Sequence, residues 1–175
     1  EGKMALHFAA QNGAADAVQL LLQARASVDL RDADGRTPLS HAVVSRDEDG
    51  LDGWEQEMRL RTVKVLVAGR ANVALADGTA STALHYAVQH GAEPTIEYIC
   101  SVSPRSVIFA PDGQGKRAAE YVRDHQHTRE IALMLQTGVC ASPALTEKRE
   151  KKGKEKRRRH EEGEEGEEGE EGEEG

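Results

Sequence analysis

The chain is poor in aromatic residues and in cysteine. Phe, Trp and Tyr make up only 3% of the 175 residues, and the two cysteines are Cys100 and Cys140. Two cysteines cannot build a disulfide framework, so we expect a buried free thiol at Cys100 and a reducing, cytoplasmic or nuclear setting. No apolar run approaches the ~18 residues that a membrane span requires, so we expect no membrane partner. Because aromatic residues are so few, we expect an aliphatic core made of small helices.

Sequence patterns for catalysis or ligand binding are also scarce. The segment Gly113-Gln114-Gly115-Lys116 reads as a turn and not as a phosphate loop. His125 and His127 are too few to hold a metal ion, and Cys140 has no base near it in the sequence. The sequence therefore predicts a protein that is not an enzyme and that uses no cofactor and no metal.

What the chain does contain is an internal repeat. The segment Ala5-Leu6-His7-Phe8 returns in related form at residues 38–41, 83–86 and 118–121. A turn rich in Asp and Gly precedes the later copies, and equivalent turn positions fall at Gly2, Gly35, Ala80 and Gly115. A period near 33 residues is typical of a stack of small helical units rather than of one globular core.

Each unit shows the same succession of signals. Thr37-Pro38 and Thr82-Ala83 are typical helix starts, because a Thr hydroxyl can cap free N–H groups and Pro is tolerated at the first helical position. A short first helix follows, and then a second helix with an apolar face. We expect that face to consist of Val18, Leu20, Leu21 and Leu22; Val63, Val65, Leu66 and Val67; Ile96, Tyr98, Ile99 and Cys100; and Ile131, Leu133, Met134 and Leu135.

This pattern resembles the ankyrin repeat family. The residues that carry the resemblance are 35–39, 82–87 with Gly91, and Leu21-Leu22 followed by 26–29. It implies an all-α, ankyrin-type helix-turn-helix solenoid of about four repeats with short β-hairpin-like turns. The repeat domain would span residues 1–138, with units at about 2–34, 35–79, 80–114 and 115–138.

The sequence departs from the family pattern at several positions. Arg25 and Arg70 stand where a Gly usually follows the second helix, and Arg46 replaces the usual Gly between the helices, so we expect strained or shifted turns there. Arg117 and Ala119 occupy the usual Thr and Leu positions, which makes the fourth unit the weakest match.

The resemblance implies a protein–protein interaction module or scaffold that presents a concave groove, and we expect a monomer. His7 and His85 would bond the backbone of neighbouring turns, and a row at one framework position, Phe8, His41, Tyr86 and Tyr121, would pack between first helices and turns. The residues expected to face a protein partner are Lys3, Gln11, Asn12, Ala33, Asp34, Arg36, Val44, Ser45, Gly78, Thr79, Ser81, Gln89, His90, Gly113, Gln114 and Lys116.

The second unit carries an insertion at about residues 46–57. It holds six acidic residues and the chain's one tryptophan, Trp54. Asp52 could cap a second helix lengthened to begin near Gly53, with Trp54, Met58 and Arg61 on one side. Our favoured interpretation is a solvated loop with Trp54 folded back on the repeat; the alternative is a docking element anchored by Trp54.

After residue 138 the composition changes. Residues 139–147 read as a linker, 148–160 as a basic disordered segment, and 161–175 as an acidic low-complexity tail of five Glu-Glu-Gly copies. The basic segment resembles a nuclear import signal, which would make an import receptor a partner. Nucleic acid is not the expected partner, because stacking aromatics are missing and the neighbouring glutamates repel phosphate. The residues of this signal are Lys148, Arg149, Lys151, Lys152, Lys154, Lys156, Arg157, Arg158 and Arg159.

Two alternative functions stay open at this point. The chain could be the regulatory or targeting arm of a larger enzyme or channel, since it opens with Glu1 and reads as a fragment of a longer array. It could also be a nuclear protein, associated with chromatin or nucleic acid, that acts through its charged tail.

Overall fold

The computed structural model describes residues 2–44, 53–90, 93–122, 133 and 135–137. All of them belong to one compact unit, residues 1–140. Its elements are α1 (Ala5–Gln11), α2 (Ala15–Gln23), α3 (Pro38–Val43), α4 (Gly53–Ala68), α5 (Ala83–Gln89), α6 (Glu93–Val102), α7 (Arg105–Ile108) and a 3-10 helix, η1 (Ala118–Tyr121). The linker 139–147, the basic segment 148–160 and the acidic tail 161–175 lie outside the described residues.

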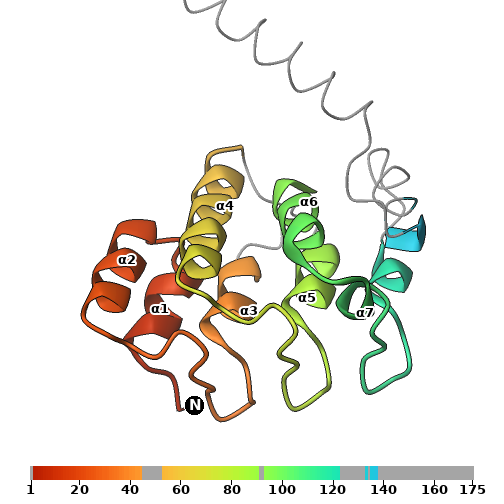
Figure 1. Cartoon of the computed structure of the whole chain (residues 1–175), viewed down its shortest axis with the longest axis horizontal. Helices are drawn as coiled ribbons and strands as arrows, with labels where there is room; N and C mark the ends of the chain where they lie inside the picture. The colour runs from red at the N-terminus through yellow and green to blue at the C-terminus, as the bar shows by residue number, and fades with distance from the viewer. Residues whose placement is uncertain (1, 45–52, 91–92, 123–132, 134, 138–175) are drawn as a thin grey trace, which may run out of the picture. The chain divides into compact units, whose positions relative to one another are not determined.

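The helices form two layers. The first helices of the units, α1, α3 and α5, contact one another in sequence order, and α5 also contacts η1. The second helices α2, α4 and α6 form the other layer, and each packs on the first helix of its own unit. Figure 1 shows three turns projecting side by side from one end of these helix pairs. The predicted all-α ankyrin-type fold is confirmed.

Leucines at one repeat position form the centre of the first-helix layer. Leu6, Leu39 and Leu84 are at most 2% exposed. In the second helices the buried positions include Val18, Val63, Leu66, Ile96 and Ile99. The prediction of the apolar face is wrong for two residues, since Leu20 is 66% exposed and Leu133 is 62% exposed. Successive helical residues are rotated by about 100°, so a run of neighbouring leucines cannot share one face.

The first helices start as the sequence indicates. The Thr37 hydroxyl accepts a hydrogen bond from the Ser40 amide at 3.3 Å, with Pro38 at the first helical position. In α1 and α5 a histidine assists instead: Nδ1 of His7 accepts from the Met4 amide at 3.0 Å, and Nδ1 of His85 from the Thr82 amide at 3.1 Å. These bonds satisfy amides that a helix start leaves without a partner.

The turns after the second helices carry the expected strain. Arg25 and Arg70 have φ values of 63° and 68°, in the left-handed region that favours glycine. Ala80, at the position occupied by Gly35 and Gly115 in the neighbouring units, has a φ of 58°. The third position that departs from the family pattern, Arg46, lies outside the described residues.

The insertion leads into the longest helix of the described chain. Helix α4 begins at Gly53, where the sequence predicts the start of a lengthened second helix, and runs for 16 residues. Its Arg59 is only 3% exposed and donates to the carbonyl groups of Ala42, at 3.3 Å, and Val44, at 2.6 Å, at the end of α3. The same guanidinium binds Glu55 at 2.6 Å. Arg59 therefore satisfies the carbonyls at the end of α3 and anchors α4 beside it.

The third and fourth units differ most from the expectation. Helix α7, which was not predicted from the sequence, follows α6 and buries Val107 and Ile108. In the fourth unit the first helix is reduced to η1, in keeping with the weak match there. No helix within the described ranges is long and apolar enough to cross a membrane.

Candidate binding surface

Each of the three complete turns is organised by one buried aspartate. Asp32, Asp77 and Asp112 are 7–8% exposed. In every case Oδ1 accepts from the backbone amides two and four residues later, at 2.8–3.0 Å. The aspartate amide in turn donates to the carbonyl group four residues on, at 2.8–3.0 Å. The carboxylate therefore fixes the path of each turn.

The second oxygen of each aspartate binds a ring nine residues later. Asp32 Oδ2 lies 2.7 Å from His41 Nε2, and the hydroxyl groups of Tyr86 and Tyr121 donate to Asp77 Oδ2 and Asp112 Oδ2. The ring belongs to the first helix, or to η1 in the fourth unit. Each turn is thus tied to the helix that follows it.

Backbone hydrogen bonds connect each turn tip to the next. The Gly78 amide donates to the Asp34 carbonyl at 2.9 Å, and the Gly113 amide donates to the Thr79 carbonyl at 2.8 Å. A Cβ atom at Gly78 would lie 3.0 Å from that Asp34 oxygen, and one at Gly113 would lie 2.8 Å from that of Thr79. Only glycine permits so close an approach, so the tips are held in a row with a defined spacing.

A row of cations runs beside the rings. Lys3, Arg36 and Lys116 occupy the same repeat position, directly after Gly2, Gly35 and Gly115, and Ser81 holds that position in the third unit. Lys3 Nζ lies 6.0 Å from the Phe8 ring centre and Lys116 Nζ lies 5.4 Å from that of Tyr121.

Arg36 reaches the next unit in the stack. Its guanidinium lies 5.1 Å from the centre of the Tyr86 ring, and its Nε lies 3.6 Å from Asp77 Oδ2. Cations this close to ring faces are held by the negative charge of the π cloud. Arg36 therefore adds a contact between the second and third units.

The buried groups have definite charge states. Burial alone would raise the pKa of Asp32, but hydrogen bonds from His41 and from the turn amides outweigh it and lower that pKa. Burial would also raise the pKa of Asp77, but the hydrogen bonds from Tyr86 and Thr79 outweigh burial and lower that pKa. Burial lowers the pKa of His41 despite its aspartate partner. At neutral pH the aspartates are ionised and the rings are neutral.

Most residues expected to face a partner are accessible. The exposed ones are Asn12, Ala33, Asp34, Gly78, Thr79, Gly113, Gln114 and Lys116, and the partly exposed ones are Lys3, Gln11, Arg36, Val44, Gln89 and His90.

Two members of the expected set do not join this surface as described. The prediction that Ser81 faces a partner is wrong, because Ser81 is only 7% exposed. Its amide donates to Asp77 and its hydroxyl accepts from Thr79, so it is part of the turn. Ser45 lies outside the described residues.

The expected ring row is confirmed for His41, Tyr86 and Tyr121, which pack between turn and helix. Phe8 is an exception, since it is 46% exposed and has no polar ring atom with which to bind a turn carboxylate.

The histidines that were expected to bond neighbouring turns behave differently from one another. His7 Nε2 donates to the Leu30 carbonyl at 2.9 Å, as expected. His85 Nε2 is buried and makes no well-formed hydrogen bond within the described chain, but the backbone of Ala110 and Lys116 in the next turn lies near it and favours its protonated form.

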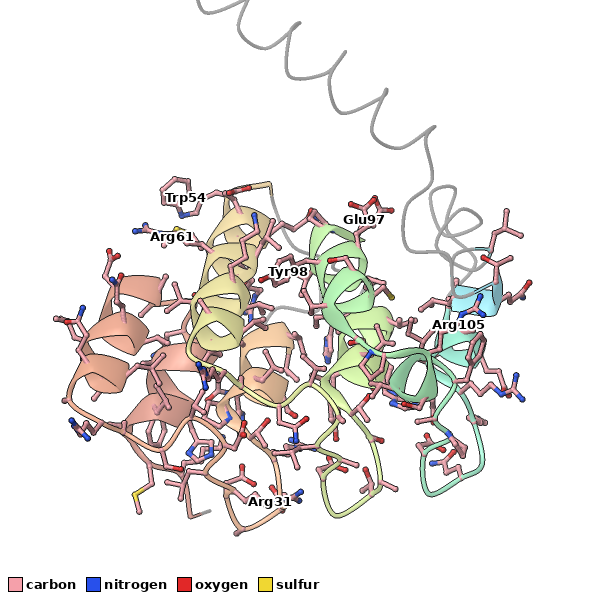
Figure 2. All side chains as sticks on the ribbon, in the orientation of Figure 1. Arg31, Trp54, Arg61, Glu97, Tyr98 and Arg105 are labelled. Carbon is pink, nitrogen blue, oxygen red and sulfur yellow. The ribbon has the colours of Figure 1, made fainter. Side chains whose placement is uncertain are left out.

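The sequence reading missed the pairing of turn aspartate and ring. The signal was available, because an aspartate is followed nine residues later by His or Tyr in three successive units. The interpretation of Trp54 as folded back on the repeat is wrong: it is 74% exposed in the first turn of α4. Figure 2 shows it at the end of α4 opposite the turns. The expected cap Asp52 and the import-signal residues 148–159 lie outside the described residues.

Stacked helix pairs joined by projecting turns define a helical repeat protein. The family model "Ankyrin repeats (3 copies)" matches residues 1–52. Neurogenic locus notch homolog protein 1 of Homo sapiens is 30% identical over 140 residues, which cover 78% of this chain and 5% of that protein. Neurogenic locus notch homolog protein 2 of Homo sapiens is 29% identical over 140 residues, with the same coverage. The chain is an ankyrin repeat protein.

The chain spans about 5% of the length of these curated relatives. Ankyrin repeats are in general interaction modules for other proteins and are not catalytic. Among the described residues, no group of three or more His, Cys, Asp or Glu side chains could hold a metal ion.

Proposed function

We propose that the row of turn tips, with the exposed side of the first helices, is the surface that binds a protein partner. The observation that carries this proposal is the register of the tips, fixed by the backbone bonds from Gly78 to Asp34 and from Gly113 to Thr79. A surface held in one conformation loses little entropy on binding, so its exposed side chains can contribute to affinity in full.

The mechanism is presentation of a fixed array rather than chemistry. The carboxylates of the turns are used internally, by amides and rings, and stabilise the backbone. The side chains left for a partner are those at the tips, such as Ala33, Thr79 and Gln114, and the cations Lys3 and Lys116. A few of these would dominate the binding energy.

Site-specific photo-crosslinking in cells tests the proposal. A photoreactive residue is placed at the exposed tip positions Ala33 and Gln114, and as a matched control at Gln19 and Lys64, which are exposed on second helices. We expect a partner that crosslinks from both tip positions and from neither control. A partner that crosslinks from Gln19 or Lys64 but from neither tip would contradict the proposal.

The domain boundaries, the monomeric state and the cytoplasmic or nuclear location stay predictions. So do the two alternative functions, as the arm of a larger enzyme or channel and as a nuclear protein acting through residues 148–175. A fusion that lacks the basic run 148–159 and still reaches the nucleus would remove the import argument.

A further inference from the structure

The outer side of the first unit exposes residues at positions that the second unit buries. Met4 is 56% exposed, Phe8 is 46% exposed, and Ala5 is also exposed. In the second unit the residues at the same repeat positions are all buried: Thr37, Pro38 and His41. Figure 1 shows α1 and α2 at one end of the row of helix pairs.

The second helix of the first unit extends the same side. Leu20 is 66% exposed and lies at the repeat position of Tyr98 in α6. Tyr98 is only partly exposed, and Lys64 of α4, in the preceding unit, lies over its ring with Nζ 5.8 Å from the ring centre. Leu20 therefore lies on the side of α2 that corresponds to the side of α6 facing the preceding unit. We call the exposed residues of the first unit on this side the end face: Met4, Ala5, Phe8 and Leu20.

Inside the stack, the preceding helix pair covers the positions of the end face. The His41 ring, at the position of Phe8, meets the His7 ring of α1 edge-on, with the ring centres 5.4 Å apart. The Tyr86 ring, at the same position one unit later, lies 5.1 Å from the guanidinium of Arg36 in the second unit. The helices themselves also pack in this order, α1 on α3, α3 on α5, α2 on α4 and α4 on α6. At both unit boundaries, the group that covers this side is therefore a helix pair of the same type.

The backbone before α1 already follows the path of a turn. Gly2 has a φ of 57°, in the left-handed region, as does Gly35 with a φ of 78°. A Cβ at Gly2 would lie 2.8 Å from the amide nitrogen of Ala33, and a Cβ at Gly35 would lie 3.0 Å from that of Gly78. Residues 2–4 therefore repeat the arm of the turn that, in the second unit, leads from the tip into α3.

We propose that the end face is a stacking surface for a further helix pair of the same repeat type, which belongs to the same polypeptide and leads into the turn at Gly2. A repeat that closes a stack has a polar outer face, whereas the end face is apolar and gains free energy when it is covered. A Lys or Arg at the repeat position of Arg36 in that helix pair would lie over the Phe8 ring. This surface is separate from the partner-binding surface at the turn tips.

Photo-crosslinking in the protein expressed from its own gene tests which group covers the end face. p-Benzoylphenylalanine is placed at Phe8 or, as a control, at Trp54, an exposed aromatic residue on α4. We expect peptide mapping to show a crosslink from Phe8 to a segment of the same polypeptide that precedes residue 1, and none to that segment from Trp54. A crosslink from Phe8 to a second copy or to a different protein, or no crosslink from Phe8, would overturn the proposal.

A chain extended in register tests whether the end face accepts such a unit. A duplicate of residues 2–34 replaces Glu1, so that Gly2 follows Asp34 as Gly35 does in the natural chain. Ala5→Cys in the original copy reports the cover of the end face, in a Cys140→Ser background in which Cys100 is buried. We expect the introduced thiol to react with a disulfide reagent about tenfold more slowly, or slower still, than in a chain extended by a Gly-Ser segment of equal length. Equal rates in the two extended chains would contradict the proposal.

Discussion

The replacement of Ala80 by glycine isolates the cost of one strained turn. Ala80 has a φ of 58°, while Gly35 and Gly115 hold the same repeat position with φ values of 78° and 76°. A residue with a Cβ loses roughly 1–2 kcal/mol in the left-handed region, and glycine costs roughly 0.4–1 kcal/mol through the larger entropy of its unfolded chain. The difference predicts that Ala80→Gly raises the free energy of unfolding by about 0.5–1 kcal/mol.

Two matched substitutions are each expected to have the opposite sign to Ala80→Gly, that is, to destabilise the chain. A Cβ at Gly115 would meet no atom within 4 Å, so Gly115→Ala tests the backbone alone and is expected to destabilise by about 1 kcal/mol. Ala33 is an exposed tip residue that is not among those with positive φ, so Ala33→Gly is expected to lose roughly 0.5 kcal/mol. Urea unfolding followed by circular dichroism measures all three. If Ala80→Gly destabilised the chain as much as Ala33→Gly, the reasoning from φ would be refuted.

Three further predictions concern the buried polar contacts. Tyr86→Phe removes the hydroxyl that donates to the buried Asp77, so we expect the free energy of unfolding in urea to fall by about 1.5–3 kcal/mol. The control Thr79→Ser keeps the other hydroxyl that donates to Asp77, and we expect no comparable loss. Acid should also destabilise the fold. Burial lowers the folded-state pKa of His41 and His85 below 6.5, so the unfolded chain binds protons first, and stability is lost as pH falls below about 6.5; unfolding free energies from pH 8 to 5 that stay flat would contradict this. Arg59→Ala leaves two carbonyls of α3 and Glu55 without their donor and should cost about 3 kcal/mol, whereas Arg59→Lys should recover part of it, as measured by thermal unfolding.

The sequence predicts much of this fold because the signals for the turn and for the two helices recur in successive units. The phase of the turns, the Thr37 cap and the strained positions Arg25 and Arg70 all follow from local chemistry that is written in a few adjacent residues. The start of α4 at Gly53 follows in the same way. Features of this kind need no knowledge of what packs against them.

The miss at Trp54 has a different cause, which is dependence on distant residues. Trp54 was expected to fold back, but Arg59 binds the end of α3 and orients α4 so that its first turn passes beyond its neighbours. Ser81 is a different case, because the groups that bury it are local: its hydroxyl accepts from Thr79 and its amide donates to Asp77 within the same turn.

The central claim is that the turn tips form one rigid row, and amide hydrogen exchange at Gly78 and Gly113 tests it most directly. Both amides lie at exposed tips and donate to the neighbouring turn. The account predicts that both exchange at least about 100-fold more slowly than an unstructured chain, while the Gly115 amide, bonded only within its own turn, is less protected. Exchange at Gly78 and Gly113 at the rate of an unstructured chain would show that the tips move independently, and would contradict the account.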